Sequence, residues 1–128
     1  MKYRIVKENR PTLKNYGRYK AVAMHYQTVG PEQLRREVQA NCSAKASDVA
    51  LVLNELSEVI CRHLQDGDRV RIEALGMLKL EIEADRVDHP DDFDMRCHFR
   101  SFRLHILPES RHGRPHLYEG IKLEKISK

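Results

Sequence analysis

The stretch that decides the fold is residues 46–82, ASDVALVLNELSEVICRHLQDGDRVRIEALGMLKLEI. Apolar side chains in its first half recur at the i, i+3, i+4 and i+7 positions of a helix that begins at residues 43–47 and ends near Gln65. Gly67 can take the left-handed conformation that closes a helix. Beyond it, apolar and polar residues alternate on either side of Gly76, which predicts a β-hairpin over residues 68–83.

Shorter elements flank this stretch on both sides. Pro31 suits a first helical turn, so a short helix is expected to end near residues 41–42. The composition of residues 2–7 and 16–28 is typical of strands. After the hairpin, residues 99–107 form a β-rich run and residues 118–126 a last extended segment.

Composition limits the class of protein. The chain has 128 residues, 41% of them hydrophobic and 33% charged, which indicates one soluble globular domain. It has no tryptophan and only 6% aromatic residues, so a partner chain is expected to complete a small core. No apolar run is long enough to cross a membrane, and residues 1–6 lack the apolar block of a signal peptide. A cytoplasmic location is therefore expected.

Charge is distributed unevenly along the chain, although the net charge is +4. Residues 1–30 hold seven Lys or Arg against one Glu, and residues 99–128 hold seven against three acids. Residues 67–98 instead hold five basic against nine acidic side chains. The most acidic segment is EADRVDHPDDFD, residues 83–94, with Pro90 inside it.

The sequence offers little for metal binding or catalysis. Cys42, Cys61 and Cys97 are odd in number and widely spaced, so buried thiols are the simplest interpretation. His112 and His116 would share a face only on a helix, which Gly113 and Pro115 disfavour. The chain has no phosphate-binding glycine loop and no nucleophile elbow. We therefore expect no cofactor, no metal, no small-molecule substrate and no enzymatic activity.

The order of these elements resembles the bacterial HU and integration-host-factor family of DNA-bending proteins. The similarity lies in PEQLRREV (residues 31–38), in residues 46–82, and above all in Leu75-Gly76-Met77-Leu78, which is similar to the family's Leu/Phe-Gly-Thr-Phe signature. The extra N-terminal strands and the ending FRSFRLHILPE…LYEGIKLEKI are closer to the longer HU-like proteins of Bacteroidetes. The resemblance covers nearly the whole chain.

The resemblance implies an α+β fold in which two chains intertwine, with a body of two main helices, β-hairpin arms and extra N-terminal strands. The single HU-like domain, residues 1–128, would comprise an N-terminal extension (1–30), the helical body and hairpin (31–82), the arm (83–98) and the return strand with the C-terminal segment (99–128). The apolar stripe, together with one hairpin residue, would form the dimer core: Val49, Val52, Leu53, Leu56, Val59, Ile60, Leu64 and Leu78.

The resemblance also implies a homodimer that binds double-stranded DNA in the nucleoid with low sequence specificity. Nucleic-acid affinity is largely a sum of contacts to phosphates, so the basic side chains of the hairpin, arm and return strand are the predicted contacts. These are Arg69, Arg71, Lys79, Arg86, Arg96, Arg100, Arg103, Arg111 and Arg114. Further basic residues at the two ends are Lys14, Arg18, Lys20, Lys122 and Lys125.

The arm tip departs from the family pattern, in which an Arg-Asn-Pro tip inserts its proline between base pairs. Five aspartates surround Pro90, and they would repel the phosphates of a groove. Three interpretations stay open for this segment: an intercalating wedge, a solvated turn, or a segment that folds onto basic residues of the same dimer. The alternative function is an HU-like dimerisation or scaffold module that binds protein and has lost DNA bending.

Overall fold

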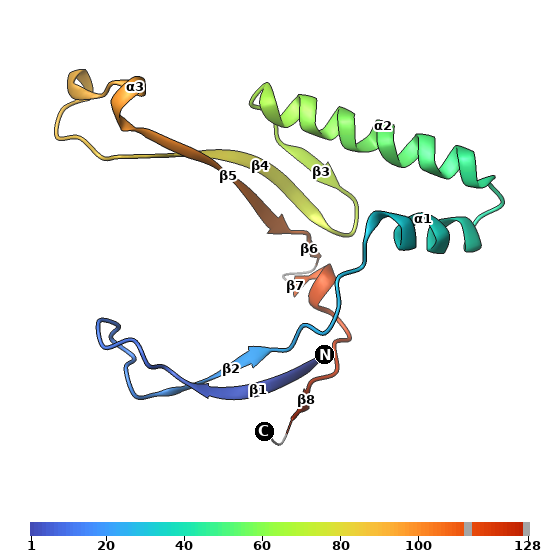
Figure 1. Cartoon of the computed structure of the whole chain (residues 1–128), viewed down its shortest axis with the longest axis horizontal. Coiled ribbons are helices and arrows are strands. Elements are labelled where there is room, and N and C mark those ends of the chain that lie inside the picture. Colours follow the sequence, from blue (N-terminus) through green and yellow to red (C-terminus); the bar gives the residue numbers. More distant parts are fainter. Residues whose placement is uncertain (112–113, 127–128) are drawn as a thin grey trace. The chain divides into compact units, whose positions relative to one another are not determined.

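The computed structural model describes residues 1–111 and 114–126, and Figure 1 shows its helices and strands. The side chains of residues 110, 111 and 114–116 lie outside this description. The chain folds into two compact units. The first contains Met1–Leu34 together with the C-terminal segment that starts at Gly120, and the second contains Arg35–Glu119. The single HU-like domain over residues 1–128 stays a prediction.

The first unit is built on a three-stranded sheet of order β2-β1-β8. Strands β1 (Lys2–Lys7) and β2 (Tyr19–Ala23) are antiparallel, and β8 (Glu124–Lys125) runs parallel to β1. The C-terminal segment thus pairs with the N-terminal strand. Strand β2 is shorter than the predicted residues 16–28. It begins only at Tyr19, because Gly17 adopts φ 83° and donates its N–H to the Glu8 carbonyl at 3.0 Å, within the connecting loop.

The two predicted helices are confirmed as α1 (Pro31–Ala40) and α2 (Ala46–Gln65). Helix α2 ends as the sequence predicts: Asp66 is its C-cap and Gly67 follows with φ 90°, in the left-handed region. The predicted hairpin is also confirmed. Strands β3 (Val70–Ile72) and β4 (Gly76–Ala84) are antiparallel, with Val70 opposite Leu78.

The second unit carries a long two-stranded extension. Strand β5 (Phe99–Pro108) pairs with β4 along the whole of β4, which completes a sheet of order β3-β4-β5. We call the part of β4 and β5 beyond β3, with the segment that joins them, the arm (Figure 1). The short strands β6 (Ser110–Arg111) and β7 (Arg114–Pro115) then pair with each other, and the 3-10 helix η2 (His116–Tyr118) follows.

Gly76 lies where β4 leaves the turn after β3. Its φ is 144°, and a Cβ atom added there would collide with the backbone carbonyl of Leu107 on β5. Only glycine allows this combination of conformation and close backbone approach. The glycine of the Leu75-Gly76-Met77-Leu78 signature is therefore required by the packing of the arm base.

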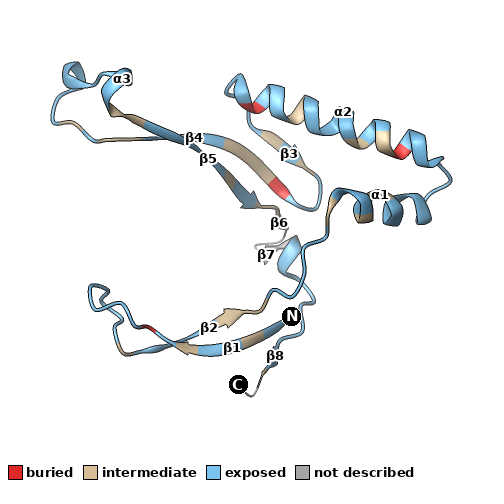
Figure 2. Cartoon of the chain, in the orientation of Figure 1, coloured by how far each residue is buried: buried red, intermediate tan, exposed pale blue. Residues whose placement is uncertain are grey.

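Helix α2 packs on β3 and β4, but the core that results is small. Among the described residues, Val49 (5% exposed) and Leu64 (7%) are the only apolar side chains that are buried. Val52 is 62% exposed and Leu56 49%, although both belong to the same apolar stripe. Most of α2 is exposed in the single chain (Figure 2). One chain therefore leaves a large part of its own apolar surface in contact with solvent.

The prediction that the thiols are buried is wrong for this chain. Cys42, Cys61 and Cys97 are all exposed and free. Cys42 follows α1, Cys97 lies at the arm tip, and Cys61 lies on α2 about 120° around the helix from Val49, outside the apolar stripe.

Replacing Gly76 by alanine should destabilise the second unit. The unfavourable backbone conformation alone costs about 1–3 kcal/mol, and the collision with Leu107 adds to that cost. Gly67→Ala is the matched control, because Gly67 also has positive φ but has open space around its α-carbon. Chemical denaturation of both variants should give the larger loss for Gly76→Ala; equal losses would show that the close approach to β5 does not matter.

Candidate nucleic-acid interface

The arm presents one apolar and one polar face, because side chains alternate along paired strands. Leu80 lies opposite Leu104 and Ile82 opposite Phe102, which creates the apolar face. On the other face, Lys79 lies opposite His105, Glu81 opposite Arg103 and Glu83 opposite Ser101. The sequence predicts this division correctly for the residues of β5.

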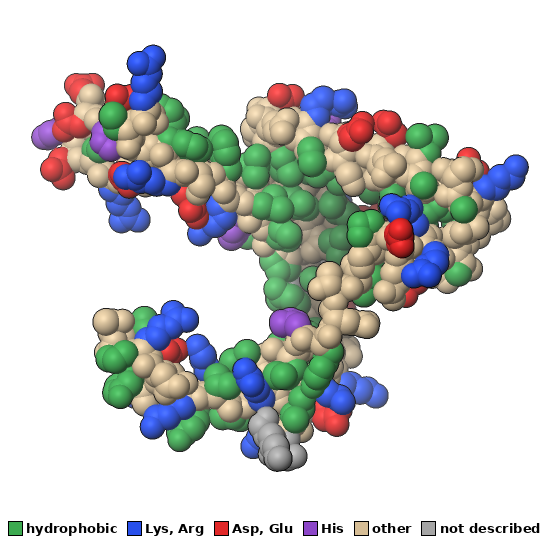
Figure 3. Space-filling view, in the orientation of Figure 1, with side chains coloured by type: hydrophobic (Ala, Val, Ile, Leu, Met, Phe, Trp, Pro, Cys, Tyr) green, Lys and Arg blue, Asp and Glu red, His purple; other side chains and the backbone are tan. Residues whose placement is uncertain are grey.

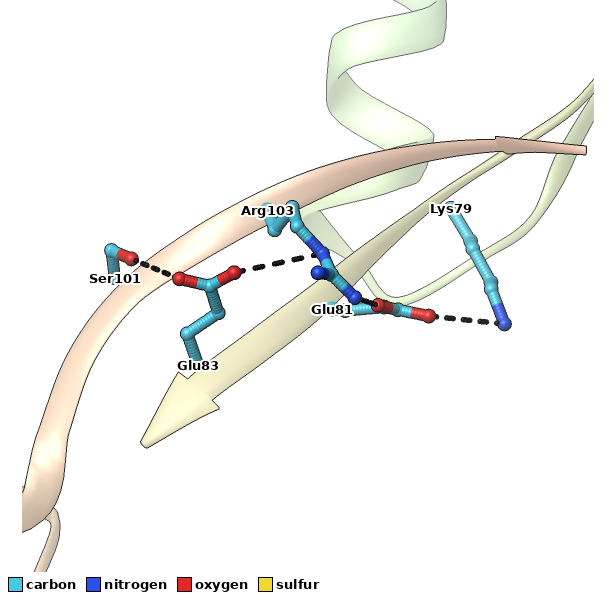
Figure 4. A network of polar contacts seen from close by, with 5 residues as sticks. All are labelled: Lys79, Glu81, Glu83, Ser101 and Arg103. Atoms are coloured by element: carbon cyan, nitrogen blue, oxygen red, sulfur yellow. Dashed lines mark hydrogen bonds and ion pairs between the residues drawn. The ribbon is translucent and has the colours of Figure 1, made fainter. Parts of the chain in front are cut away.

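The polar face is a continuous network of hydrogen bonds and ion pairs (Figure 4). Arg103 Nη2 donates to Glu81 Oε2 at 2.6 Å, and Lys79 Nζ lies 3.3 Å from Glu81 Oε1. Arg103 Nε also lies 3.6 Å from Glu83 Oε1, while Ser101 Oγ donates to the other carboxylate oxygen of Glu83 at 3.2 Å. Two predicted DNA contacts, Lys79 and Arg103, therefore have acidic partners within the arm.

Two more predicted contacts are paired in the same way. Arg100 Nε donates to Asp85 Oδ1 at 3.0 Å, and its Nη2 contacts the second carboxylate oxygen. Arg71 forms an ion pair with Glu109, whose carboxylate also accepts a hydrogen bond from the backbone N–H of Ala74. Glu109, the residue that follows β5, therefore connects the end of this strand to β3 and to the turn between β3 and β4.

The ion pairs shift the titration of their members. Hydrogen bonds from Arg103 and Lys79 lower the pKa of Glu81, and the hydrogen bond from Arg100 lowers the pKa of Asp85. The same contacts raise the pKa of Arg103 and Arg100. At neutral pH the carboxylates are ionised, so they offset much of the positive charge along the arm.

The remaining predicted contacts differ in their surroundings. Arg69, Arg86 and Arg96 are exposed and form no ion pair with any of the residues the structure describes. The backbones of Arg111 and Arg114 pair with each other between β6 and β7, and their side chains lie outside the described residues. DNA contact by any of the nine basic residues stays a prediction.

The arm tip is folded, a feature that the sequence analysis missed. Pro90 begins a 3-10 helix, η1 (Pro90–Asp92), and α3 (Met95–His98) follows. Asp94 caps α3 by accepting a hydrogen bond from the Arg96 N–H at 3.0 Å, and the ring centroids of Phe93 and His98 lie 5.5 Å apart. Pro90 at a first helical position and Asp94 at an N-cap are recognised helix signals that could have revealed both elements.

The acidic side chains at this tip face solvent. Asp88, Asp91 and Asp92 are exposed and form no ion pair within the described part of the chain. Figure 3 shows acidic side chains gathered around η1 and α3. This arrangement is closest to the predicted solvated turn, with the turn replaced by two short helices.

The residues predicted for a dimer core fall into three groups in the single chain. Val49 and Leu64 are buried, Leu53, Val59, Ile60 and Leu78 are half-buried, and Val52 and Leu56 are exposed. The apolar face of the arm is exposed in the same way, with Ile82 59%, Phe102 64%, Leu104 51% and Ile106 56% accessible. Their burial in a dimer stays a prediction.

Within residues 1–111 and 114–126, no group of three or more His, Cys, Asp or Glu side chains is arranged to hold a metal ion. Of the two histidines at residues 112 and 116, His112 lies outside the described residues and the side chain of His116 is not described. No helix in the described part of the chain combines the length and the apolar character needed to span a bilayer.

A small helical body with a glycine-anchored β-arm defines the HU-like class of domain. The model of a family described as "HU domain fused to wHTH, Ig, or Glycine-rich motif" matches residues 1–109, and the chain belongs to this family. A crystal structure from Bacteroides vulgatus ATCC 8482, described as a "Putative bacterial DNA binding protein", has the same fold, with a TM-score of 0.65 at 12% identity. The similarity covers 98% of this chain and 47% of that one. Comparison with curated proteins finds no match.

Acidification should weaken the arm. The carboxylates of Glu81 and Asp85 have lowered pKa values in the folded chain, so their stabilising contribution is present above the ordinary carboxyl range and is lost as the pH falls through the lowered values. Thermal unfolding of the wild type should therefore shift to lower temperature between neutral pH and about pH 3. A Glu81→Gln/Asp85→Asn variant should lose less over the same interval, and an equal loss would contradict the assignment.

Proposed function

We propose that this chain is an HU-like, nucleoid-associated protein that binds double-stranded DNA as a homodimer with little sequence preference. Membership of the HU family carries the proposal, and the protruding β-arm supports it. Arg69, Arg86 and Arg96 are exposed, so their charges can reach the phosphates of a duplex. The cytoplasmic nucleoid is the location that such a protein would occupy.

The exposed apolar surface supports the homodimer. A stripe of α2 residues and one whole face of the arm are accessible in the single chain. Exposed apolar patches of this kind mark association surfaces, and a second copy would contribute both a matching stripe and a matching arm face. Burial of these residues in a dimer would also enlarge the core, in which Val49 and Leu64 are the apolar side chains already buried in the described part of the single chain.

The alternative function, a dimerisation or scaffold module that binds protein, is favoured by the charge of the second unit. Residues 35–119 contain thirteen Lys or Arg against sixteen Asp or Glu. Four of the nine predicted DNA contacts already have acidic partners. The arm therefore has few cations available for phosphates, and its tip would repel them.

Titration with salt distinguishes the two functions. We expect the protein to bind a generic duplex, with the logarithm of the affinity falling linearly as the logarithm of the salt concentration rises. The slope should be several units, at about 0.9 per phosphate neutralised. Fluorescence anisotropy with two duplexes of unrelated sequence provides the measurement. Absence of binding at low salt would reject DNA binding and leave the scaffold function.

The dimer can be tested with a pair of helix variants. Val52 and Leu51 are similarly exposed, at 62% and 61%, but Val52 belongs to the apolar stripe whereas Leu51 lies on the opposite side of α2. Val52→Asp would bury an unpaired charge in the dimer, which costs about 3 kcal/mol or more and weakens association more than 100-fold. Leu51→Asp should leave the mass at twice 15.0 kDa in analytical ultracentrifugation. A monomeric wild type at micromolar concentration would refute the homodimer.

A further inference from the structure

The positive charge of the protein resides in the first unit. Residues 1–34 and 120–128 contain ten Lys or Arg against three Glu, whereas the second unit has more acidic than basic residues. Lys and Arg side chains are visible over the β1–β2 hairpin in Figure 3. A nucleic-acid ligand, whose phosphates are the source of most of its attraction to proteins, would favour this unit over the arm.

The segment of the β1–β2 loop that follows Glu8, residues 9–18, concentrates this charge. Its sequence is NRPTLKNYGR, with Arg10, Lys14 and Arg18 and with no acidic residue. We call this segment the hairpin tip. Arg10 is 76% exposed at its side chain, and Lys14 and Arg18 are exposed as well. Lys14 and Arg18 form no ion pair with any described residue, in contrast to the paired cations of the arm.

Glu8 fixes the base of the hairpin tip and consumes little of its charge. Its side chain is only 11% exposed; Oε2 accepts a hydrogen bond from Lys20 Nζ at 2.8 Å, and Oε1 accepts one from the Arg10 backbone N–H at 3.2 Å. The Glu8 backbone N–H donates to the Arg18 carbonyl at 2.8 Å. The Glu8 carboxylate is thus largely covered; it pairs closely with Lys20, and Arg10 Nε lies farther away, 3.9 Å from Oε1.

The hairpin tip is also ordered by its own backbone. Three successive turns are closed by hydrogen bonds from Leu13 N–H to the Arg10 carbonyl, from Tyr16 N–H to the Leu13 carbonyl and from Arg18 N–H to the Asn15 carbonyl, at 3.0–3.1 Å. A loop that is already ordered loses little conformational entropy when it binds. The cationic side chains therefore extend from a preformed platform.

Two exposed apolar side chains accompany the cations. Tyr16 is 59% exposed and Leu13 42%. Amphipathic and apolar side chains beside phosphate-binding cations are typical of surfaces that also touch the sugars and the minor groove of a duplex. Neither residue is covered by the sheet of the first unit, so both are available to a ligand.

We propose that the hairpin tip is a second DNA-binding element, in which Arg10, Lys14 and Arg18 contact the phosphates of a duplex and Tyr16 contacts its sugars. This inference rests on the proposed DNA-binding function and assigns part of that function to the first unit. Two of the three tip cations, Lys14 and Arg18, form no ion pair with the described residues, and Arg10 Nε lies 3.9 Å from Glu8 Oε1. On the arm, Lys79, Arg100 and Arg103 are paired with carboxylates.

The test compares two double variants of the full chain in the salt titration. Lys14→Gln/Arg18→Gln removes the two unpaired tip cations, and Lys45→Gln/Arg62→Gln removes two exposed cations at and near the ends of α2. The tip variant should lose about 2 units of slope and bind roughly 50-fold more weakly at about 0.1 M salt, whereas the α2 variant should retain the wild-type slope. Tyr16→Ala should bind several-fold more weakly with no change in slope.

Control measurements separate charge from folding. The charge-conserving variant Lys14→Arg/Arg18→Lys should restore the wild-type slope, and circular dichroism should show that each variant is folded. A wild type that binds DNA with a slope unaffected by Lys14→Gln/Arg18→Gln would overturn this inference and leave the proposed function standing. A wild type that binds no DNA would overturn both. If Lys14→Gln/Arg18→Gln lost binding to phosphatidylserine vesicles but not to DNA, the hairpin tip would belong to a membrane surface, and this inference would be overturned as well.

Discussion

The rest of the structure depends on how one helix is covered. Helix α2 carries an apolar stripe along twenty residues, and only Val49 and Leu64 of this stripe are buried in the single chain. Apolar side chains left in water forfeit roughly 25 cal/mol for each Å² that could be buried. In the proposed homodimer, burial of the exposed stripe residues and of the arm face would add to the stability that so small a core provides.

The arm illustrates a balance between stiffness and affinity. The polar face of the arm carries a network in which Glu81 pairs with both Arg103 and Lys79, and Asp85 accepts a hydrogen bond from Arg100. Such cross-strand pairs keep a solvent-exposed two-stranded ribbon in register. The same carboxylates reduce the positive potential that a phosphate would meet, so the pairs that hold the strands in register would also weaken the attraction of the arm to DNA. In the proposed DNA complex, Lys14 and Arg18 of the hairpin tip would compensate for this weaker attraction.

The sequence predicted most of the fold, because the spacing of apolar residues and the residues that end helices and form turns are local signals. The bounds of α2, the closing role of Gly67 and the division of faces along β5 all follow from spacing and residue type. The folded arm tip was missed because helices of three and four residues carry no periodic signal, although Pro90 and Asp94 mark their starts. The pairing of Arg71 with Glu109 and of Arg100 with Asp85 depends on strand register and on residues far apart in sequence, which spacing does not provide. The exposure of the three cysteines likewise depends on which parts of the chain are covered, which the spacing of residues does not reveal.

The parallel pairing of β8 with β1 has a consequence for the order of folding. Residues 2 and 124 meet in one sheet, so β1 acquires its second neighbour only after the whole second unit has been synthesised. The second unit is in this sense an insertion between the two parts of the first. The hairpins and helices of the second unit involve closer contacts along the chain, and they can form earlier. Closure of the sheet by β8 would then be a late step, and a chain interrupted before residue 124 would expose one edge of β1 to other strands.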